Sequence, residues 1–404
     1  GLNRAMGTNL FDQITYNHFI TDEGKLGIVL TAFEHAKNQV NASLHFDTYR
    51  GVGLILNYTA RNVLAESSRL LITADIAEQP KARINFQKNF GKNKDWWWGS
   101  ELYGAFLKQE IFINGKSADN MLYNAFEFNN EANRNLNSLK SYIGLGLNYN
   151  YTEVKPKNDP NLNPNILSLN NYNFEDIEIN IHYSYNDMDK VFFATNGTIL
   201  RANINRSLFS DTNINYTDTN LTDYSGQTNG FTKFGLGFEK RLQLKKKVTC
   251  IMGFDTNFIL QDKLEDGDVS FSDYGYASKY FLGGILPTSG SNRFSFPGLH
   301  EDEVNASQYM AVKLGAQINP IGKIYLTPHF NIATVGFGNF NEYIGEAFNP
   351  KGNWDNGTET SLLLSGGAAA SYLSILGPIH FDVSWVNNID KVRLFFSVGL
   401  SLNP

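Results

Sequence analysis

Ser291 and Ser365 of this 404-residue chain each stand beside a glycine, a setting in which serine can act as the nucleophile of an acyl hydrolase. Such a serine usually lies in G-x-S-x-G, whose sharp turn exposes the hydroxyl group, and a glycine-rich loop supplies the oxyanion hole. Ser291, in SGSNRF, and Ser365, in LSGGAAA, both lack the second glycine at the required spacing. We therefore predict no catalytic residue in this chain, although a parent protein could still carry hydrolase activity elsewhere.

The other residue types that could do chemistry are dispersed. The chain contains neither HExxH nor a glycine-rich phosphate loop, and its seven histidines are scattered. The single cysteine, Cys250, excludes an intramolecular disulfide and a cysteine-cluster metal site. We expect no cofactor and no metal. The net charge of −6 is mild, and the only basic run is Lys245 to Lys247, so we expect no nucleic-acid partner.

A period of two dominates the chain. In EDIEINIHYSYND, residues 175 to 187, an apolar or aromatic side chain occupies every second position and polar ones lie between. Because a strand sends successive side chains to opposite faces, this segment predicts a strand with one apolar and one polar face. Roughly sixteen such segments run from NASLHFDTY to KVRLFFSVGLSL, each near the length that a tilted strand needs to cross a bilayer.

Composition and connection lengths indicate a membrane β-barrel. Aromatic residues make up 14% of the chain and charged residues only 18%, and no apolar run is long enough for a spanning helix. Long connections alternate with short ones such as NPIG and LGP, as in outer-membrane barrels. The long ones are residues 152 to 174, 210 to 229, 260 to 306 and 336 to 359. We predict an all-β fold, a 16-stranded antiparallel transmembrane β-barrel over residues 39–404, with the polar face lining the lumen.

Five tryptophans are candidates for the aromatic girdle that marks the two membrane interfaces of such a barrel. They are Trp96, Trp97, Trp98, Trp354 and Trp385. A girdle implies contact with outer-membrane lipid or lipopolysaccharide. We therefore predict a location in the bacterial outer membrane, with both termini on the periplasmic side because the strand count is even. A homo-oligomer is a further possibility.

Residues 1–38 differ from the rest. A short helical start precedes the expected strand FDQITY, and after a turn at residues 22–25 comes a second expected strand, residues 26–33. This half of an α/β module resembles the C-terminal part of a POTRA domain, the periplasmic module of the Omp85 superfamily. The alternative is an irregular N-terminal plug.

Two further stretches resemble Omp85 patterns. That family has an Asp-x-x-x-Phe-Pro-Thr-x-Gly pattern between its eighth and ninth strands. DKVFFATNG places Asp189, Phe193, Thr195 and Gly197 on it, with Ala194 in place of proline. The family also has a long sixth outer loop that folds into the lumen and carries Gly-Gly and then an Arg-Gly-aromatic tip. Residues 260–306 contain Gly283 and Gly284, followed by RFSFPGL with Arg293, Phe296, Pro297 and Gly298. Because the Arg-Gly tip is absent, Arg293 is the candidate for the anchoring arginine.

Three functions follow as hypotheses. One POTRA-like unit running into LHFDTYRGVGLIL resembles the C-terminal half of bacterial patatin-like phospholipases. That resemblance implies a barrel that anchors a covalently linked N-terminal hydrolase domain, absent from this chain. The first alternative is an Omp85-type insertase or protein-secretion pore, which predicts incomplete pairing between residues 41–49 and 391–402. The second is a solute channel, which an obstructed lumen would disfavour.

Overall fold

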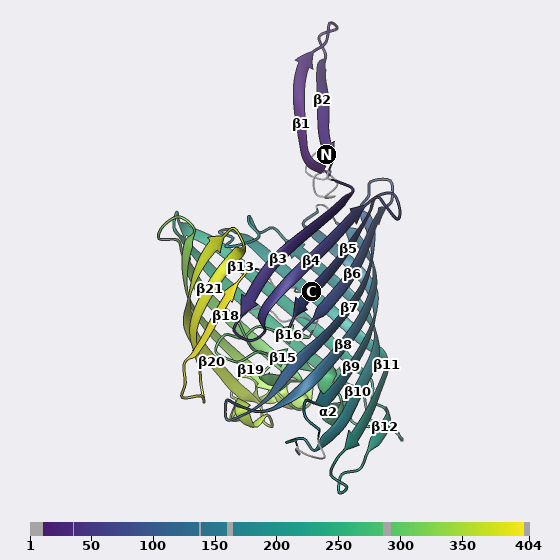
Figure 1. Ribbon diagram of the computed structural model, residues 1–404, viewed down its shortest axis with the longest axis vertical. Helices are drawn as coiled ribbons and strands as arrows, with labels where there is room; N and C mark the ends of the chain where they lie inside the picture. Colours follow the sequence, from purple (N-terminus) through teal and green to yellow (C-terminus); the bar gives the residue numbers. More distant parts are fainter. Residues whose placement is uncertain (1–10, 35, 137–138, 160–164, 286–291, 400–404) are drawn as a thin grey trace.

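The computed structural model describes residues 11–34, 36–136, 139–159, 165–285 and 292–399. Most of these residues form one closed antiparallel barrel, which Figure 1 shows from the side. Sixteen strands form the wall, and the short β12 (Tyr224–Gln227) adds to β11 beyond the point where β13 begins to pair. The predicted all-β class, strand number and antiparallel arrangement are confirmed.

The wall strands follow one another around the barrel in chain order. They are β3 (Asn38–Asp47), β4 (Gly51–Arg61), β5 (Ser68–Ala77), β6 (Lys81–Phe90), β7 (Trp96–Ile113), β8 (Lys116–Asn135), β9 (Ser141–Pro156), β10 (Leu169–Asn186), β11 (Gly197–Tyr216), β13 (Phe231–Lys245), β14 (Val248–Gln261), β18 (Gln308–Ile318), β19 (Ile324–Gly336), β20 (Ser361–Ser374), β21 (Gly377–Val386) and β22 (Arg393–Val398).

The apolar face of each strand points outward. One continuous row crosses five neighbouring strands through paired positions, and it consists of Leu145, Ile181, Ile204, Phe234 and Phe258. Such side chains stay substantially exposed, with Ile181 at 53% and Ile204 at 47%. A soluble domain would bury them, whereas a membrane barrel presents this band to lipid.

The polar face lines an interior crossed by ion pairs and hydrogen bonds. His45 of β3 lies 2.8 Å from Asp75 of β5, and Lys233 of β13 lies 2.6 Å from Glu178 of β10. All four side chains are buried or nearly so. Charges removed from water need partners of this kind, so the alternation in the sequence also determines the polar lining.

Strands β7 to β11 are longer than the sequence predicted, at 16 to 20 residues each. Their lower halves in Figure 1 extend as paired ribbons, so the connections after β9 and β11 are shorter than the ranges expected. The extension is stable because neighbouring strands satisfy each other's backbone groups.

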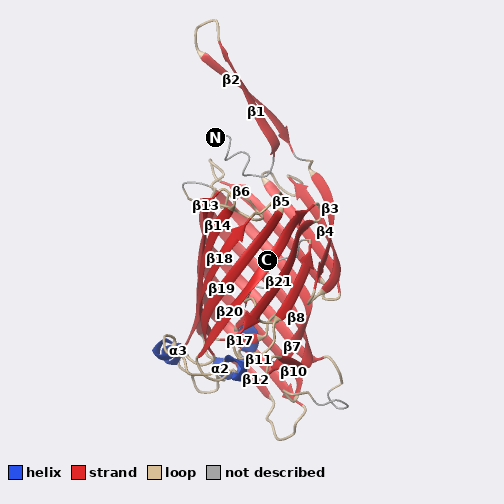
Figure 2. Ribbon diagram, turned by 90° about the vertical axis from the view of Figure 1, so that its left-hand side faces the viewer, coloured by secondary structure: helices blue, strands red, loops and turns tan. Residues whose placement is uncertain are grey.

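The end of the barrel opposite the N-terminal hairpin carries the long connections (Figure 2). The connection between β14 and β18 holds α2 (Phe271–Tyr274), η1 (Tyr276–Ser278), β15 (Tyr280–Leu282), β16 (Arg293–Phe294) and β17 (Val304–Ala306). The connection between β19 and β20 holds α3 (Phe340–Glu346) and η2 (Trp354–Asn356). In the described part of the chain, no helix is long and apolar enough to cross a membrane.

The N-terminal segment is a hairpin that projects from the other end of the barrel (Figure 1). β1 (Phe11–Ile20) pairs with β2 (Leu26–Glu34), as the sequence indicated, around a turn that contains Gly24 at φ +72°. The helix end expected before this hairpin lies outside the described residues.

Candidate functional site: the seam and the lumen loop

The barrel closes through a short seam between its first and last strands. Within the described part of the chain, which ends at residue 399, β22 pairs with β3 at two positions, Asp47 with Ser397 and Phe46 with Val398, whereas β3 pairs with β4 at ten. Just beyond the ladder, the Thr48 N–H donates to the Phe396 carbonyl at 3.0 Å, and Thr48 Oγ1 accepts from the Phe396 N–H at 2.8 Å. In the described residues, the rest of β3 therefore has ladder partners on one side only.

Gly399 follows the seam in a conformation that favours glycine. Its φ is +87°, and a Cβ atom there would collide with the Leu44 carbonyl of β3. Its N–H donates to the Pro378 carbonyl at 3.0 Å, which continues the contact with β21.

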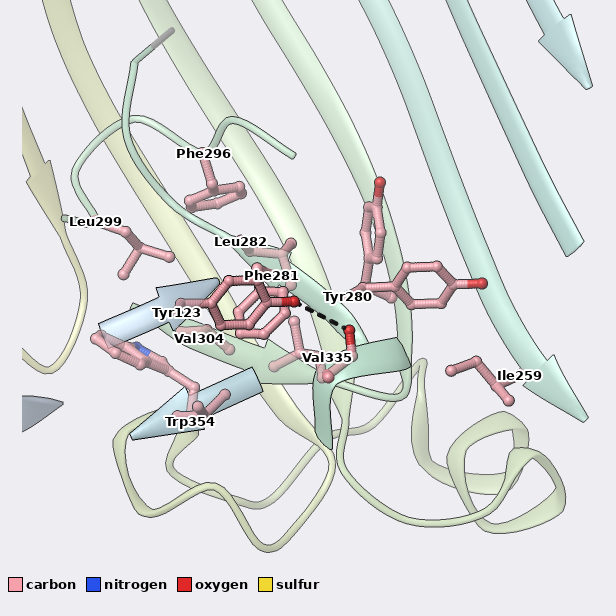
Figure 3. Close-up of a cluster of buried hydrophobic side chains, with 14 of the residues drawn as sticks. Tyr123, Ile259, Tyr280, Phe281, Leu282, Phe296, Leu299, Val304, Val335 and Trp354 are labelled. Atoms are coloured by element: carbon pink, nitrogen blue, oxygen red, sulfur yellow. Dashed lines mark hydrogen bonds between the residues drawn. The ribbon is translucent and has the colours of Figure 1, made fainter. Parts of the chain in front are cut away.

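The connection between β14 and β18, residues 262–307, is the sixth long-end loop counted from β3, and we call it the lumen loop. It folds inward as a three-stranded sheet in the order β16, β15, β17. Phe281, Leu282, Phe296 and Leu299 are almost completely buried. Figure 3 shows them packed with Tyr123 of the barrel wall, and a hydrogen bond from Tyr123 to the Ala277 carbonyl spans 3.4 Å. An apolar core inside the barrel holds the loop in place.

Arg293 joins this core to the wall. Its guanidinium lies over the Tyr123 ring of β8 and over the Phe281 ring of the loop, 4.7 Å from each centroid, and pairs with the Asp302 carboxylate. The side chain is 3% exposed. A cation between two aromatic faces and a carboxylate is strongly held when water is excluded. The structure therefore places Arg293 where it can anchor the loop.

Gly283 and Gly284 form the tight turn that follows β15. Gly283 has φ +153° and lies against the loop's own returning chain, where a Cβ atom would collide with the His300 carbonyl oxygen. Gly284 has φ +72°, and its N–H donates to the Leu299 carbonyl at 3.2 Å. The pair of glycines is needed because backbone passes backbone at this point.

We expect Gly283→Ala to displace the lumen loop. The added methyl meets backbone atoms that cannot rotate away, at a φ that alanine rarely adopts, so a cost of about 1–3 kcal/mol or more is expected. Limited proteolysis of the long-end loops should reveal faster cleavage. Gly345→Ala is the matched control, because Gly345 of α3 has no atom within 4 Å of a new Cβ. Equal cleavage of both variants would contradict the close-approach argument.

Phe296, Pro297 and Gly298 turn beside the last strands of the barrel. Phe296 is buried, and a Cβ atom on Gly298 would lie 2.8 Å from the Trp385 carbonyl of β21. The Gly298 carbonyl accepts from Arg393 Nη1 of β22 at 2.9 Å. This part of the loop therefore contacts the inner side of the strands that form one edge of the seam.

Two ion pairs next to the seam were not predicted from the sequence. Arg50 follows β3 and donates to Glu301 Oε1 from Nη2 at 2.7 Å and from Nε at 2.9 Å. Arg393 opens β22 and donates from both terminal nitrogens to Glu303, at 2.9 Å for Nη2 to Oε1. The only signal in the sequence is the acidic run Glu301-Asp302-Glu303, which by itself usually marks a solvated loop.

His300 lies beside these pairs among aromatic rings. Its ring stacks on Phe112 of β7 at 5.0 Å and meets Tyr49 edge-on at 5.7 Å. Burial, and then the charge of Arg393, lower the pKa of His300 to about 4, although Glu110 opposes this shift. His300 is therefore neutral near pH 7 and acts as an aromatic contact of the loop.

The turn between β10 and β11 contains the residues matched to the strand 8–9 pattern. Asp189 accepts from the Thr195 N–H at 2.8 Å and from its hydroxyl at 2.6 Å. Partial desolvation would raise the pKa of Asp189, but these hydrogen bonds lower it below its usual value. Phe193 has φ +51° and stacks on Tyr325 of β19 at 4.1 Å, and Gly197 has φ +135°. The turn thus reaches across the hairpin end of the lumen to distant strands.

The tryptophans predicted as a girdle divide into three groups. Trp96, Trp98 and Trp385 are 39–42% exposed on the outer face. Trp97 lies on the opposite face of β7 from its two neighbours and meets Tyr142 edge-on at 5.4 Å. Trp354 is 2% exposed in η2, where its Nε1–H donates to the Asn387 carbonyl at 3.1 Å. The girdle prediction is wrong for Trp354, because a loop folded over the barrel end buries its ring. Trp97 faces the lumen and not the membrane.

The other candidate polar side chains make structural contacts. Ser365 is fully buried on β20, and its hydroxyl accepts from Asn331 at 3.0 Å. Ser291 lies outside the described residues. Lys233 donates to Ser278 of the loop at 2.6 Å, but it also pairs with Glu178, so it is a cation rather than a base. Among the residues that the structure describes, no group of His, Cys, Asp or Glu could hold a metal ion.

The described strands define a sixteen-stranded antiparallel β-barrel with a long loop folded into its lumen. Similar solved structures are BamA from Haemophilus ducreyi lacking POTRA domains 1–3 and CdiB from Acinetobacter baumannii and from Escherichia coli. The BamA structure has a TM-score of 0.65 at 14% identity and covers 98% of this chain and 76% of that one.

Both CdiB structures have a TM-score of 0.56 at 9% identity and cover 98% of this chain, with 66% of the Acinetobacter protein and 70% of the Escherichia protein. At such identities the comparison establishes the fold. No family model and no curated protein matches the sequence.

Proposed function

We propose that this protein is an Omp85-type transport barrel that passes polypeptide segments into or across the outer membrane through the seam between β3 and β22. The observation that supports this function best is the short seam ladder among the described residues, where β22 and β3 pair at two positions. Wall strands held by long ladders resist separation, whereas a short ladder can open at low cost. The predicted incomplete pairing concerned residues 41–49 and 391–402, and residues 400–402 lie outside the described residues.

The edge of β3 suits this role. Residues Asn38–His45 pair with β4 on one side, and among the described residues they have no ladder partner on the other. Unpaired N–H and C=O groups on a strand edge are a template for an added strand. A client segment that takes the place of the last strand along β3 would satisfy the backbone groups of this edge while it enters the membrane or crosses it.

The N-terminal hairpin supports a periplasmic module at the hairpin end. Along one face of the paired strands lie Ile14, Tyr16, Ile20, Ile28 and Leu30, of which Tyr16 is 61% exposed and Ile20 76%. A two-stranded ribbon with an uncovered apolar face is only marginally stable alone. We propose that residues 1–38 are part of a POTRA-like unit on the periplasmic side.

The anchor of a patatin-like phospholipase remains a separate hypothesis. Nothing in the described structure favours it over the transport barrel, and it requires a hydrolase domain on the same polypeptide. Intact mass of the native protein, with fluorophosphonate labelling, tests it: a mass above 45.4 kDa with labelling would support it. A solute channel is disfavoured because the lumen loop buries Phe281 and Phe296 inside the barrel.

A disulfide across the seam tests the transport function. Phe46→Cys with Val398→Cys, in a Cys250→Ser background, joins two directly paired residues at a separation that suits a disulfide. We expect oxidation to abolish the protein-dependent folding of an unfolded eight-stranded outer-membrane barrel into proteoliposomes, and reduction to restore it. The measurement is the folding rate with and without reductant.

The control joins the same position to the other neighbour of β3. Phe46 also pairs with Val52 of β4, so Phe46→Cys with Val52→Cys creates a disulfide that leaves the seam free. This variant should keep its activity when oxidised. If both disulfides leave activity unchanged, the seam is not the route, and the proposed function fails.

A further inference from the structure

The seam is closed from inside the lumen as well as by its own ladder. Three consecutive carboxylates of the lumen loop, Glu301, Asp302 and Glu303, pair with three arginines from different parts of the chain. Arg50 stands just after β3, and Arg393 is the first residue of β22. The two outer carboxylates therefore bind the two edges of the seam, while the middle one pairs with Arg293 within the loop.

Burial makes these pairs strong contacts. The exposed side-chain fractions are 6% for Arg50 and 8% for Arg393, against 19% for Glu301 and 1% for Glu303. Both arginines bind through two nitrogens, the arrangement in which a guanidinium and a carboxylate match best. Separating such a pair leaves each charge without a partner in a low-dielectric interior. The free energy of the unpaired charges therefore favours the closed geometry.

Ring contacts hold the loop segment between the two edges in place. His300 stacks on Phe112, and Tyr49 of the first edge contacts both His300 and Phe395 of the last edge, at 5.7 and 5.2 Å. Because Arg293 anchors the loop on Tyr123 of β8, away from the seam, Glu301 and Glu303 are held at a fixed separation. Movement of β22 away from β3 must therefore break at least one of the two ion pairs.

We propose that Glu301 and Glu303 form an internal latch that keeps the seam between β3 and β22 closed, and that the barrel opens when one of them releases its arginine. This inference rests on the proposed function in that it takes the seam to be the part that opens. A client that reaches the lumen loop, or displaces it, would thereby release the edge strands. The lumen loop would then control the opening of the seam in addition to filling the lumen.

Spin labels on the outer face of the two edge strands report seam opening without any client. Leu44→Cys on β3 and Leu394→Cys on β22, in a Cys250→Ser background, are exposed positions on opposite edges. We expect one narrow distance distribution for the starting protein. Glu301→Gln with Glu303→Gln should add a longer distance, because loss of one charged hydrogen bond already shifts an equilibrium about tenfold.

Three further variants make the test specific. Asp255→Asn removes a carboxylate that pairs with Lys313 on the lumen wall away from the seam, at 2.7 Å, and should leave the distance unchanged. Glu301→Gln alone should widen the distribution less than the double variant does. Glu303→Arg with Arg393→Glu exchanges the charges and should restore the narrow distance that Glu303→Gln loses.

The outcomes separate the latch from the transport function. An unchanged distance in the folded double variant, judged by its β-sheet circular dichroism, would overturn the latch even if the seam disulfide blocks transport. Conversely, a widened seam in the double variant together with full activity of the oxidised seam disulfide would uphold the latch and reject transport through the seam. An equal widening in Asp255→Asn would also overturn the latch, because any lost lumen charge would then suffice.

Discussion

Replacing Arg293 with alanine should loosen the lumen loop more than any other single truncation in it. The change removes a guanidinium from beside the buried Asp302 carboxylate and from between the rings of Tyr123 and Phe281. Breaking a buried ion pair by removing one partner costs about 3–5 kcal/mol. We expect a lower urea midpoint and rapid proteolysis of residues 262–307, measured on the protein in detergent.

An exposed ion pair provides the control for this prediction. Arg206 pairs with Asp262 at 2.5 Å, but the two side chains are 42% and 47% exposed. Arg206→Ala should therefore cost less than about 1 kcal/mol. Arg293→Lys should recover only part of the loss, because an ammonium group lacks the planar face that lies over both rings. If the two alanine variants lose equal stability, burial does not give Arg293 its anchoring role.

A charge on the outer band should be nearly as costly. Ile204 lies at the centre of the row of paired outward side chains, between Ile181 and Phe234, and is 47% exposed. In a bilayer this exposed surface meets hydrocarbon, so we expect Ile204→Arg to destabilise the barrel by about 2–4 kcal/mol. Reversible unfolding from lipid vesicles, followed by tryptophan fluorescence, measures the change.

The adjacent residue tests the assignment of the two faces. Asn203 points into the lumen, where its amide donates to Asn205 at 3.1 Å. Asn203→Arg places the same charge one residue away in a polar interior and should cost far less than Ile204→Arg. Equal costs would mean that the two faces had been assigned the wrong way round.

Much of the fold could be predicted from local pattern. The alternation in segments such as residues 175–187 is a property of the strand itself, so strand positions, facing and number follow from sequence. The place of the lumen loop between the eleventh and twelfth strands then follows by counting. Strand ends were less predictable: β7 to β11 extend beyond the expected crossing length because partner strands continue to satisfy their backbone groups.

The seam and the lumen loop were harder to predict from local sequence pattern. Gly283 and Arg293 were singled out because residues 260–306 resemble the sixth outer loop of the Omp85 superfamily, and not from a local property of either residue. Trp354 was misassigned because girdle and buried tryptophans have the same local sequence, and only the loop above the barrel end distinguishes them. The partners of the edge arginines could not be predicted, because Arg50 and Arg393 lie 251 and 90 residues from the glutamates that they bind.

The sequence by itself therefore determined an all-β chain. Its strands have an apolar outer face and a polar inner face, and one long loop contains the glycine pair and Arg293. Only the tertiary structure decided the register in which the first and last strands pair, and which arginines Glu301 and Glu303 bind. The reason is physical. Alternation acts between neighbouring residues, whereas the seam and its ion pairs exist only after closure brings the first and last strands together.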